Sequence, residues 1–224
     1  MRPGLSPHAP YSFRFDRLVD IARFNLPVAI HFAESLDEID LIAEHDGEFV
    51  PFLEELGVWD TTGLPVLDGG EHPLAGAKNL LLIHGNYLPA DASIPANATV
   101  VYCPRTHAAF GHPPHPFREW LKHGVNVALG TDSLATNPDL SILNEARFVF
   151  AAHPDLEPQT LLSMITKMGA SALGFGDECG VIAPGFATDL CVVGLAGLVT
   201  DPLQAVFAGN GPVRAVFADG WRVI

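Results

Sequence analysis

The stretch that decides the fold reads PVAIHFAES over residues 27–35. Its apolar run, Val28 to Ile30, stops at His31, and Glu34 follows just before residues that favour the start of a helix. A buried strand of a parallel sheet has this pattern, because it is apolar on both faces and carries polar side chains at its carboxyl end. The stretch therefore predicts a buried parallel strand that delivers a histidine and a glutamate to one end of the sheet.

The same pattern occurs twice more along the chain. The apolar residues 80–83 end at His84, and residues 125–130 lead to Asp132. Taken alone, either histidine could be a hydrogen-bonded core residue, Glu34 could simply begin a helix, and Asp132 could cap one. Three strands that each deliver a His or Asp at the same end favour a shared site, which an α/β barrel places at the carboxyl ends of its strands.

Strands and helices alternate over most of the chain, which predicts an α/β fold with a parallel sheet. The fold class expected is a partial TIM-type (β/α) barrel, about strands 4–8, with a small C-terminal β appendage. The domains expected are residues 1–179 for the barrel and 180–224 for the appendage, read as all-β. Helices are predicted over residues 13–24, 36–45, 49–56, 117–123, 139–152 and 158–172, and further strands over 99–103, 189–193, 213–217 and 221–224.

The composition of the chain argues against several classes of protein. The chain has 12 Lys and Arg against 26 Asp and Glu, a formal net charge of −14, which argues against nucleic acid or an anionic membrane as a partner. The N-terminal residues lack the apolar core of a signal peptide, and no apolar run approaches the length of a bilayer span. The three cysteines lack the spacing of a disulfide framework or a thiolate metal site. A soluble, cytoplasmic protein is expected.

The strand-end residues suit metal-assisted hydrolysis. A histidine can bind a divalent metal, and a carboxylate three residues later can accept a proton from the activated water and pass it to a leaving amine. Arg105 and His107, after the strand at 99–103, could bind a polar or anionic group of a substrate, although a solvated loop is about equally consistent with them. His8 lies in a proline-rich loop and could contact a substrate, whereas His112 and His115 are predicted to be surface loop residues.

These motifs resemble those of a known family. The order His31-Phe32-Ala33-Glu34, His84, Cys103-Pro104 and Gly130-Thr131-Asp132-Ser133 resembles the amidohydrolase superfamily, in the branch of cytosine deaminase, triazine chlorohydrolases and adenosine-type deaminases. The resemblance implies hydrolysis of a non-peptide C–N bond, deaminating an amino-substituted heterocycle or nucleoside-like small molecule, with zinc or iron(II) as cofactor.

The resemblance also implies a role for each matched residue. His31 and Asp132 would be metal ligands, with Asp132 also a base, Glu34 the proton shuttle, and His84 a catalytic residue that steadies water or substrate. His8 would lie near the substrate, where Arg105 and His107 could also bind it.

The sequence departs from the family in one respect: no His-x-His pair, which the first barrel strand would supply, occurs in it. By resemblance the chain would begin near the end of strand four. The expectation is therefore a C-terminal part of a longer enzyme, partnered by the missing N-terminal half or by a second copy. Two alternatives are an inactive half-barrel that acts as a structural or binding subunit, and a rebuilt site in which His8 or His107 replaces the missing ligands.

Overall fold

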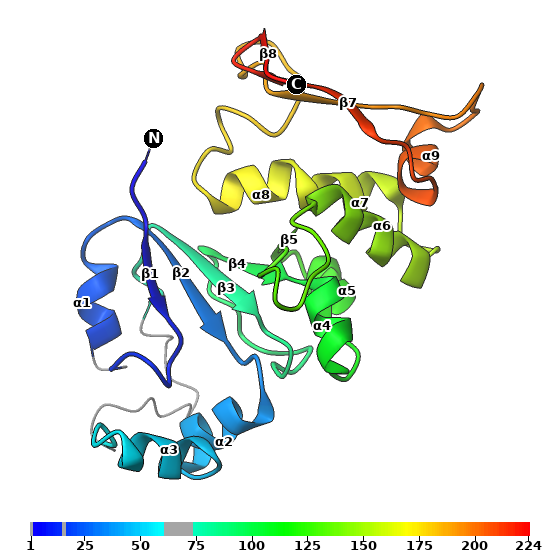
Figure 1. The fold of residues 1–224 in the computed structure, drawn as a ribbon. Helices are drawn as coiled ribbons and strands as arrows, with labels where there is room; N and C mark the ends of the chain where they lie inside the picture. The colour runs from blue at the N-terminus through cyan, green and yellow to red at the C-terminus, as the bar shows by residue number, and fades with distance from the viewer. Residues whose placement is uncertain (1, 15–16, 61–73) are drawn as a thin grey trace. The chain divides into compact units, whose positions relative to one another are not determined.

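The computed structural model describes residues 2–14, 17–60 and 74–224. Its larger sheet has five strands whose spatial order follows the sequence, and the pairs β1–β2, β2–β3 and β3–β4 are parallel (Figure 1). The strands are β1 (Leu5–His8), β2 (Pro27–Phe32), β3 (Asn79–His84), β4 (Ala98–Tyr102) and β5 (Asn126–Leu129). The predicted mainly parallel α/β arrangement is confirmed. The strand β1 was not predicted, because its four residues LSPH include a proline.

The apolar runs of the strands form a buried core. In the register of β2 and β3, Val28 lies opposite Leu80 and Ile30 opposite Leu82. All four side chains are at most 1% exposed, together with Leu18 of α1 (Leu18–Ala22). Burial on this scale holds the strands in register, since a slip by one residue would turn every one of these side chains to the other face. The register in turn fixes which residues reach the carboxyl ends.

The first of two compact units spans Met1–Tyr102 and Gly111–Val127. Its helices α2 (Leu36–Glu44), α3 (Phe49–Glu55) and α5 (Phe117–Lys122) agree with the predicted ranges within one residue. The Ser35 side chain caps α2 by accepting from the Glu38 N–H. The helix predicted over residues 13–24 is shorter than expected: α1 occupies Leu18–Ala22, and residues 15 and 16 lie outside the described residues.

The second unit spans Cys103–Phe110 and Ala128–Ile224. It holds α4 (Pro104–Phe110), α6 (Ile142–Ala152), α7 (Pro158–Ile165), α8 (Lys167–Ala172) and α9 (Pro202–Ala208). A three-stranded antiparallel sheet orders β6 (Leu190–Val193), β7 (Val213–Ala218) and β8 (Trp221–Arg222). The expected domain boundary at residues 179 and 180 stays a prediction.

Three local predictions in the second unit were wrong. Residues 104–110 form α4, where no helix was predicted, and the helix predicted over 158–172 is divided at Thr166 into α7 and α8. The tail is not all-β, because α9 lies between β6 and β7. The signals for α9 are present in the sequence: Asp201 caps it by accepting from the Gln204 N–H, Pro202 occupies its first turn, and Gly209 ends it.

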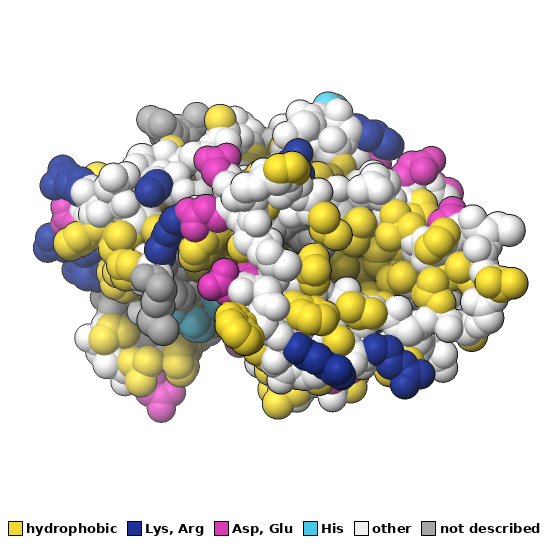
Figure 2. Space-filling view, turned by 90° about the horizontal axis from the view of Figure 1, so that it is seen from above, with side chains coloured by type: hydrophobic (Ala, Val, Ile, Leu, Met, Phe, Trp, Pro, Cys, Tyr) yellow, Lys and Arg dark blue, Asp and Glu magenta, His cyan; other side chains and the backbone are white. Residues whose placement is uncertain are grey.

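The C-terminal sheet exposes apolar side chains. Val192, Val213 and Trp221 are 45%, 41% and 78% exposed. Figure 2 looks onto the surface that carries this sheet and shows hydrophobic side chains gathered on it. Among the residues described, no helix combines the length and the apolar character that a membrane span requires.

Candidate metal centre and active site

The backbone at the ends of four strands is left-handed. His8, Ala33, His84 and Asp132 have φ values of 68°, 53°, 73° and 55°, and they lie at or just after the ends of β1, β2, β3 and β5. A non-glycine residue in this conformation costs about 1–3 kcal/mol, and such residues concentrate where a fold presents functional groups. The predicted functional end of the sheet is therefore also where the backbone is strained.

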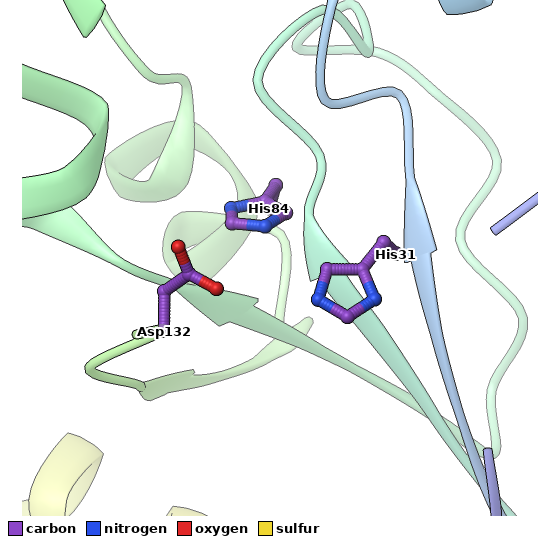
Figure 3. Close-up of side chains that lie close together, drawn as sticks. All are labelled: His31, His84 and Asp132. Atoms are coloured by element: carbon purple, nitrogen blue, oxygen red, sulfur yellow. The ribbon is translucent and has the colours of Figure 1, made fainter. Parts of the chain in front are cut away.

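His31 and His84 lie side by side at this end, on the adjacent strands β2 and β3 (Figure 3). Their ring centroids are 5.3 Å apart, and the His8 ring lies 5.2 Å from that of His31. Nδ1 of His31 is 3.1 Å from the backbone oxygen of His8. Because a carbonyl oxygen only accepts, this bond assigns the proton to Nδ1 and leaves Nε2 with a lone pair that can bind a metal.

Glu34 faces His84. Its Oε1 lies 3.5 Å from Nε2 of His84, and the His84 side chain is 1% exposed. The backbone of Glu34 is held on both sides, because its N–H donates to the Glu38 carboxylate and its carbonyl accepts from the Asn86 side chain. The structure therefore brings together four of the predicted site residues in the first unit, namely His8, His31, Glu34 and His84.

His115 forms a hydrogen bond to the backbone of His84, which the sequence did not predict. His115 is 8% exposed, so its interpretation as a surface loop residue was wrong. Its Nδ1 accepts from the Phe117 N–H at 3.2 Å, so its Nε2 carries the proton and donates to the His84 carbonyl at 2.8 Å. The ring also stacks on Tyr102 with centroids 4.1 Å apart. Aromatic residues around the sequence HPPH at 112–115 were the only signal of this burial.

Asp132 belongs to the second unit and follows the end of β5 (Figure 3). One of its carboxylate oxygens accepts from the Thr136 hydroxyl at 3.1 Å, and its side chain is exposed. The Asn137 side chain donates to the carbonyl of Thr131 at 2.8 Å, and to the buried carboxylate of Glu145. The turn that carries Asp132 is thus fastened to α6.

Arg105 is engaged within the second unit. Its Nε donates to Glu145 and its Nη2 donates to Asp139, both at 2.7 Å. The guanidinium holds the pKa of the Asp139 carboxyl well below its ordinary value, chiefly through the hydrogen bonds between them. These contacts favour a structural role for Arg105, and its predicted substrate contact stays a prediction. His107 is 7% exposed within α4, so it is not in a solvated loop.

The chain matches the model of the amidohydrolase family over residues 1–223. The chain belongs to the amidohydrolase family. It is 33% identical to a 5-methylthioadenosine/S-adenosylhomocysteine deaminase of Pyrococcus abyssi, over 96% of this chain and 51% of that protein. It is 27% identical to a 5'-deoxyadenosine deaminase of Methanocaldococcus jannaschii, over 97% of this chain and 52% of that protein. The chain therefore spans about half the length of the curated relatives it matches.

Solved structures of other proteins resemble this amidohydrolase in fold. A zinc-bound adenosine deaminase of Xanthomonas campestris superposes with a TM-score of 0.75 at 26% identity, over 98% of this chain and 51% of that protein. The aminofutalosine deaminase of Helicobacter pylori in complex with methylthio-coformycin gives a TM-score of 0.80 at 24% identity, over 99% and 57%. The family expected from the order of the motifs is confirmed.

Proposed function

We propose that this amidohydrolase chain forms part of a metal-dependent deaminase that replaces the exocyclic amine of a nucleoside-like heterocycle by the oxygen of water. The observation that carries the proposal is the placement of His31 and His84 side by side at the carboxyl ends of adjacent strands, with the Glu34 carboxylate 3.5 Å from His84. Imidazole and carboxylate groups at such a position serve both metal binding and proton transfer. The deaminases among the relatives support the choice of reaction.

The metal would be held by His31 and Asp132. An imidazole and a carboxylate suit zinc first and iron(II) second. The bound ion would supply an attacking water whose pKa is lowered towards neutrality. The zinc in the Xanthomonas enzyme supports this assignment.

We propose a role for each of these side chains. Glu34 accepts a proton from the attacking water at Oε1 and passes it to the amine, which leaves as ammonia while the ring carbon keeps the oxygen. Asp132 acts as a second base, and His84 orients the water or the ring. The ring centroid of His8 lies 5.2 Å from that of His31, and His8, Arg105 and His107 are the proposed substrate contacts.

The proposed partner of this partial barrel is the first half of the barrel or a second copy of the chain. We place the chain as strands four to eight of a (β/α) barrel, because it spans half of its relatives. A separate first half of the barrel or a second copy of the chain would then complete the site. The alternative is an inactive half-barrel that serves as a structural or binding subunit. A cytoplasmic location stays a prediction.

One experiment separates these functions. Zinc and iron are measured by elemental mass spectrometry in the dialysed chain, alone and after co-expression with the part of the Pyrococcus abyssi deaminase that the match leaves uncovered. Ammonia release from adenosine and methylthioadenosine is then followed in both samples, beside the Glu34→Gln variant. Metal near one ion per chain with ammonia release that Glu34→Gln strongly lowers supports the deaminase. A soluble, metal-free and inactive protein in both samples supports the structural subunit.

A further inference from the structure

The carboxylate of Glu38 is buried beneath the turn that presents Glu34. Glu38 lies in the first turn of α2, and its side chain is 0% exposed. Its Oε1 accepts from the N–H of Ala33 at 2.8 Å, and its Oε2 accepts from the N–H of Glu34 at 3.0 Å. Both oxygens therefore fix backbone amides, one of Ala33, which directly follows β2, and one of Glu34, the proposed proton shuttle.

This geometry differs from an ordinary capping box. Ser35 caps α2, and a glutamate three residues later usually accepts from the N–H of the cap residue itself. Glu38 accepts instead from the two residues before the cap, the first of which is the left-handed Ala33. The carboxylate thus stabilises the strained turn, and capping of the helix does not require that placement.

Burial of the Glu38 carboxylate costs desolvation free energy, which indicates that its two hydrogen bonds stabilise the turn. The pKa of Glu38 is raised from an ordinary value of 4.5 to about 7, chiefly by burial; the negative charge of Glu34 adds to the shift, and the hydrogen bonds from the two amides oppose it. A solvent-exposed glutamate could interact with the positive end of α2 without this penalty. The penalty is offset where the carboxylate satisfies two buried amides in a turn of fixed shape.

We propose that Glu38 is a positioning residue that holds the Glu34 carboxylate against His84, an inference that rests on the role proposed for Glu34. The amide before Glu34 is fixed by Glu38, and the carbonyl after it is fixed by the Asn86 side chain at 3.1 Å. With the backbone held at both ends, only the side-chain torsions of Glu34 are left to vary. Asn86 itself follows His84, so the same bonds join the ends of β2 and β3.

The test compares Glu38→Gln with Glu44→Gln, the same change at an exposed glutamate of the same helix. A glutamine offers one acceptor oxygen and turns an NH₂ group towards the other amide, so one of the two hydrogen bonds is lost. In the active deaminase, Glu38→Gln is expected to lower kcat by about 10- to 100-fold, with KM and metal content unchanged. Hydrogen exchange at the amides of Ala33 and Glu34 should accelerate by about tenfold or more. Glu44→Gln should change none of these quantities.

The Glu34→Gln background distinguishes positioning from general destabilisation. If Glu38 acts through Glu34, adding Glu38→Gln to Glu34→Gln lowers kcat no further, since coupled residues are not additive. A full additional loss in the double variant, or unchanged exchange at Ala33 and Glu34, would overturn the inference. If Glu38→Gln does not fold, Glu38→Asp, whose carboxylate is one methylene shorter, carries the same comparison. The exchange measurement needs no catalysis. An absence of deaminase activity both in the chain alone and in the co-expressed sample would refute the proposed function, and hydrogen exchange would still test Glu38.

Discussion

Replacement of Arg105 by alanine decides between two roles for this residue. The Glu145 side chain is 0% exposed and accepts from Nε of Arg105 at 2.7 Å. Removing the guanidinium leaves a buried carboxylate without its cation, and breaking such a pair costs about 3–5 kcal/mol. The lower end applies here, because the Arg105 N–H and the Asn137 side chain still donate to Glu145. We therefore expect Arg105→Ala to lower the free energy of unfolding by about 3 kcal/mol.

The assay is thermal unfolding followed by circular dichroism. For a chain of this size each kcal/mol shifts Tm by about 2–4 °C, so the expected fall is roughly 6–12 °C. The matched control is Arg23→Ala, which removes an arginine whose ion pair with Asp20 is 75% and 50% exposed. That variant should change stability by less than about 1 kcal/mol. An unchanged Tm in Arg105→Ala together with a raised KM would refute the structural role and restore the predicted substrate contact.

The effect of Arg105→Ala should also depend on pH. The Arg105 guanidinium depresses the pKa of Asp139 below its ordinary value of 3.8. A depressed carboxyl pKa stabilises the folded state above the ordinary value, and this contribution is lost as pH falls towards the folded-state pKa. The difference in unfolding free energy between the wild type and Arg105→Ala should therefore be constant from pH 6 to 8 and should shrink below about pH 4. A difference that widens in acid would contradict this reasoning.

Three further predictions concern the first unit. The pKa of Glu38 is raised from 4.5 to about 7, chiefly by burial, so the folded state binds a proton that the unfolded state has released. As pH rises across that range, the free energy of unfolding of the wild type should therefore fall by up to about 3 kcal/mol relative to that of Glu38→Gln, measured by urea unfolding. His115→Phe keeps the ring stack on Tyr102 but removes the hydrogen bonds of His115 to the His84 carbonyl and from the Phe117 N–H. The free energy of unfolding should therefore fall by about 1–3 kcal/mol. Equal stability of the variant would show that water replaces the imidazole. His31→Ala should reduce dialysis-resistant zinc to near zero by elemental mass spectrometry, whereas His123→Ala, at an exposed histidine, should not; retained zinc in His31→Ala would place the ligands elsewhere.

Much of the fold was predictable because it depends on local pattern. The apolar runs before His31 and His84 fix buried strands, and parallel strands end at one edge, so the sequence predicted which side chains reach that edge. The helix α2 was predictable from its cap Ser35 and its acidic first turn. The helix α9 was missed although Asp201, Pro202 and Gly209 bound it. Pro7 within β1 hid a strand that pairs with β2.

The sequence by itself determined the family, the order of the strands and the residues that carry the proposed chemistry. Tertiary structure decided how those residues are held. Three buried polar side chains, Glu38, His115 and Asn137, fasten the backbone around Glu34, His84 and Thr131. A sequence pattern records which residues are polar, but a hydrogen bond between His115 and His84 spans 31 positions. Such a bond exists only once the packing of the sheet brings the two residues together, because burial removes the water that would otherwise pair with them.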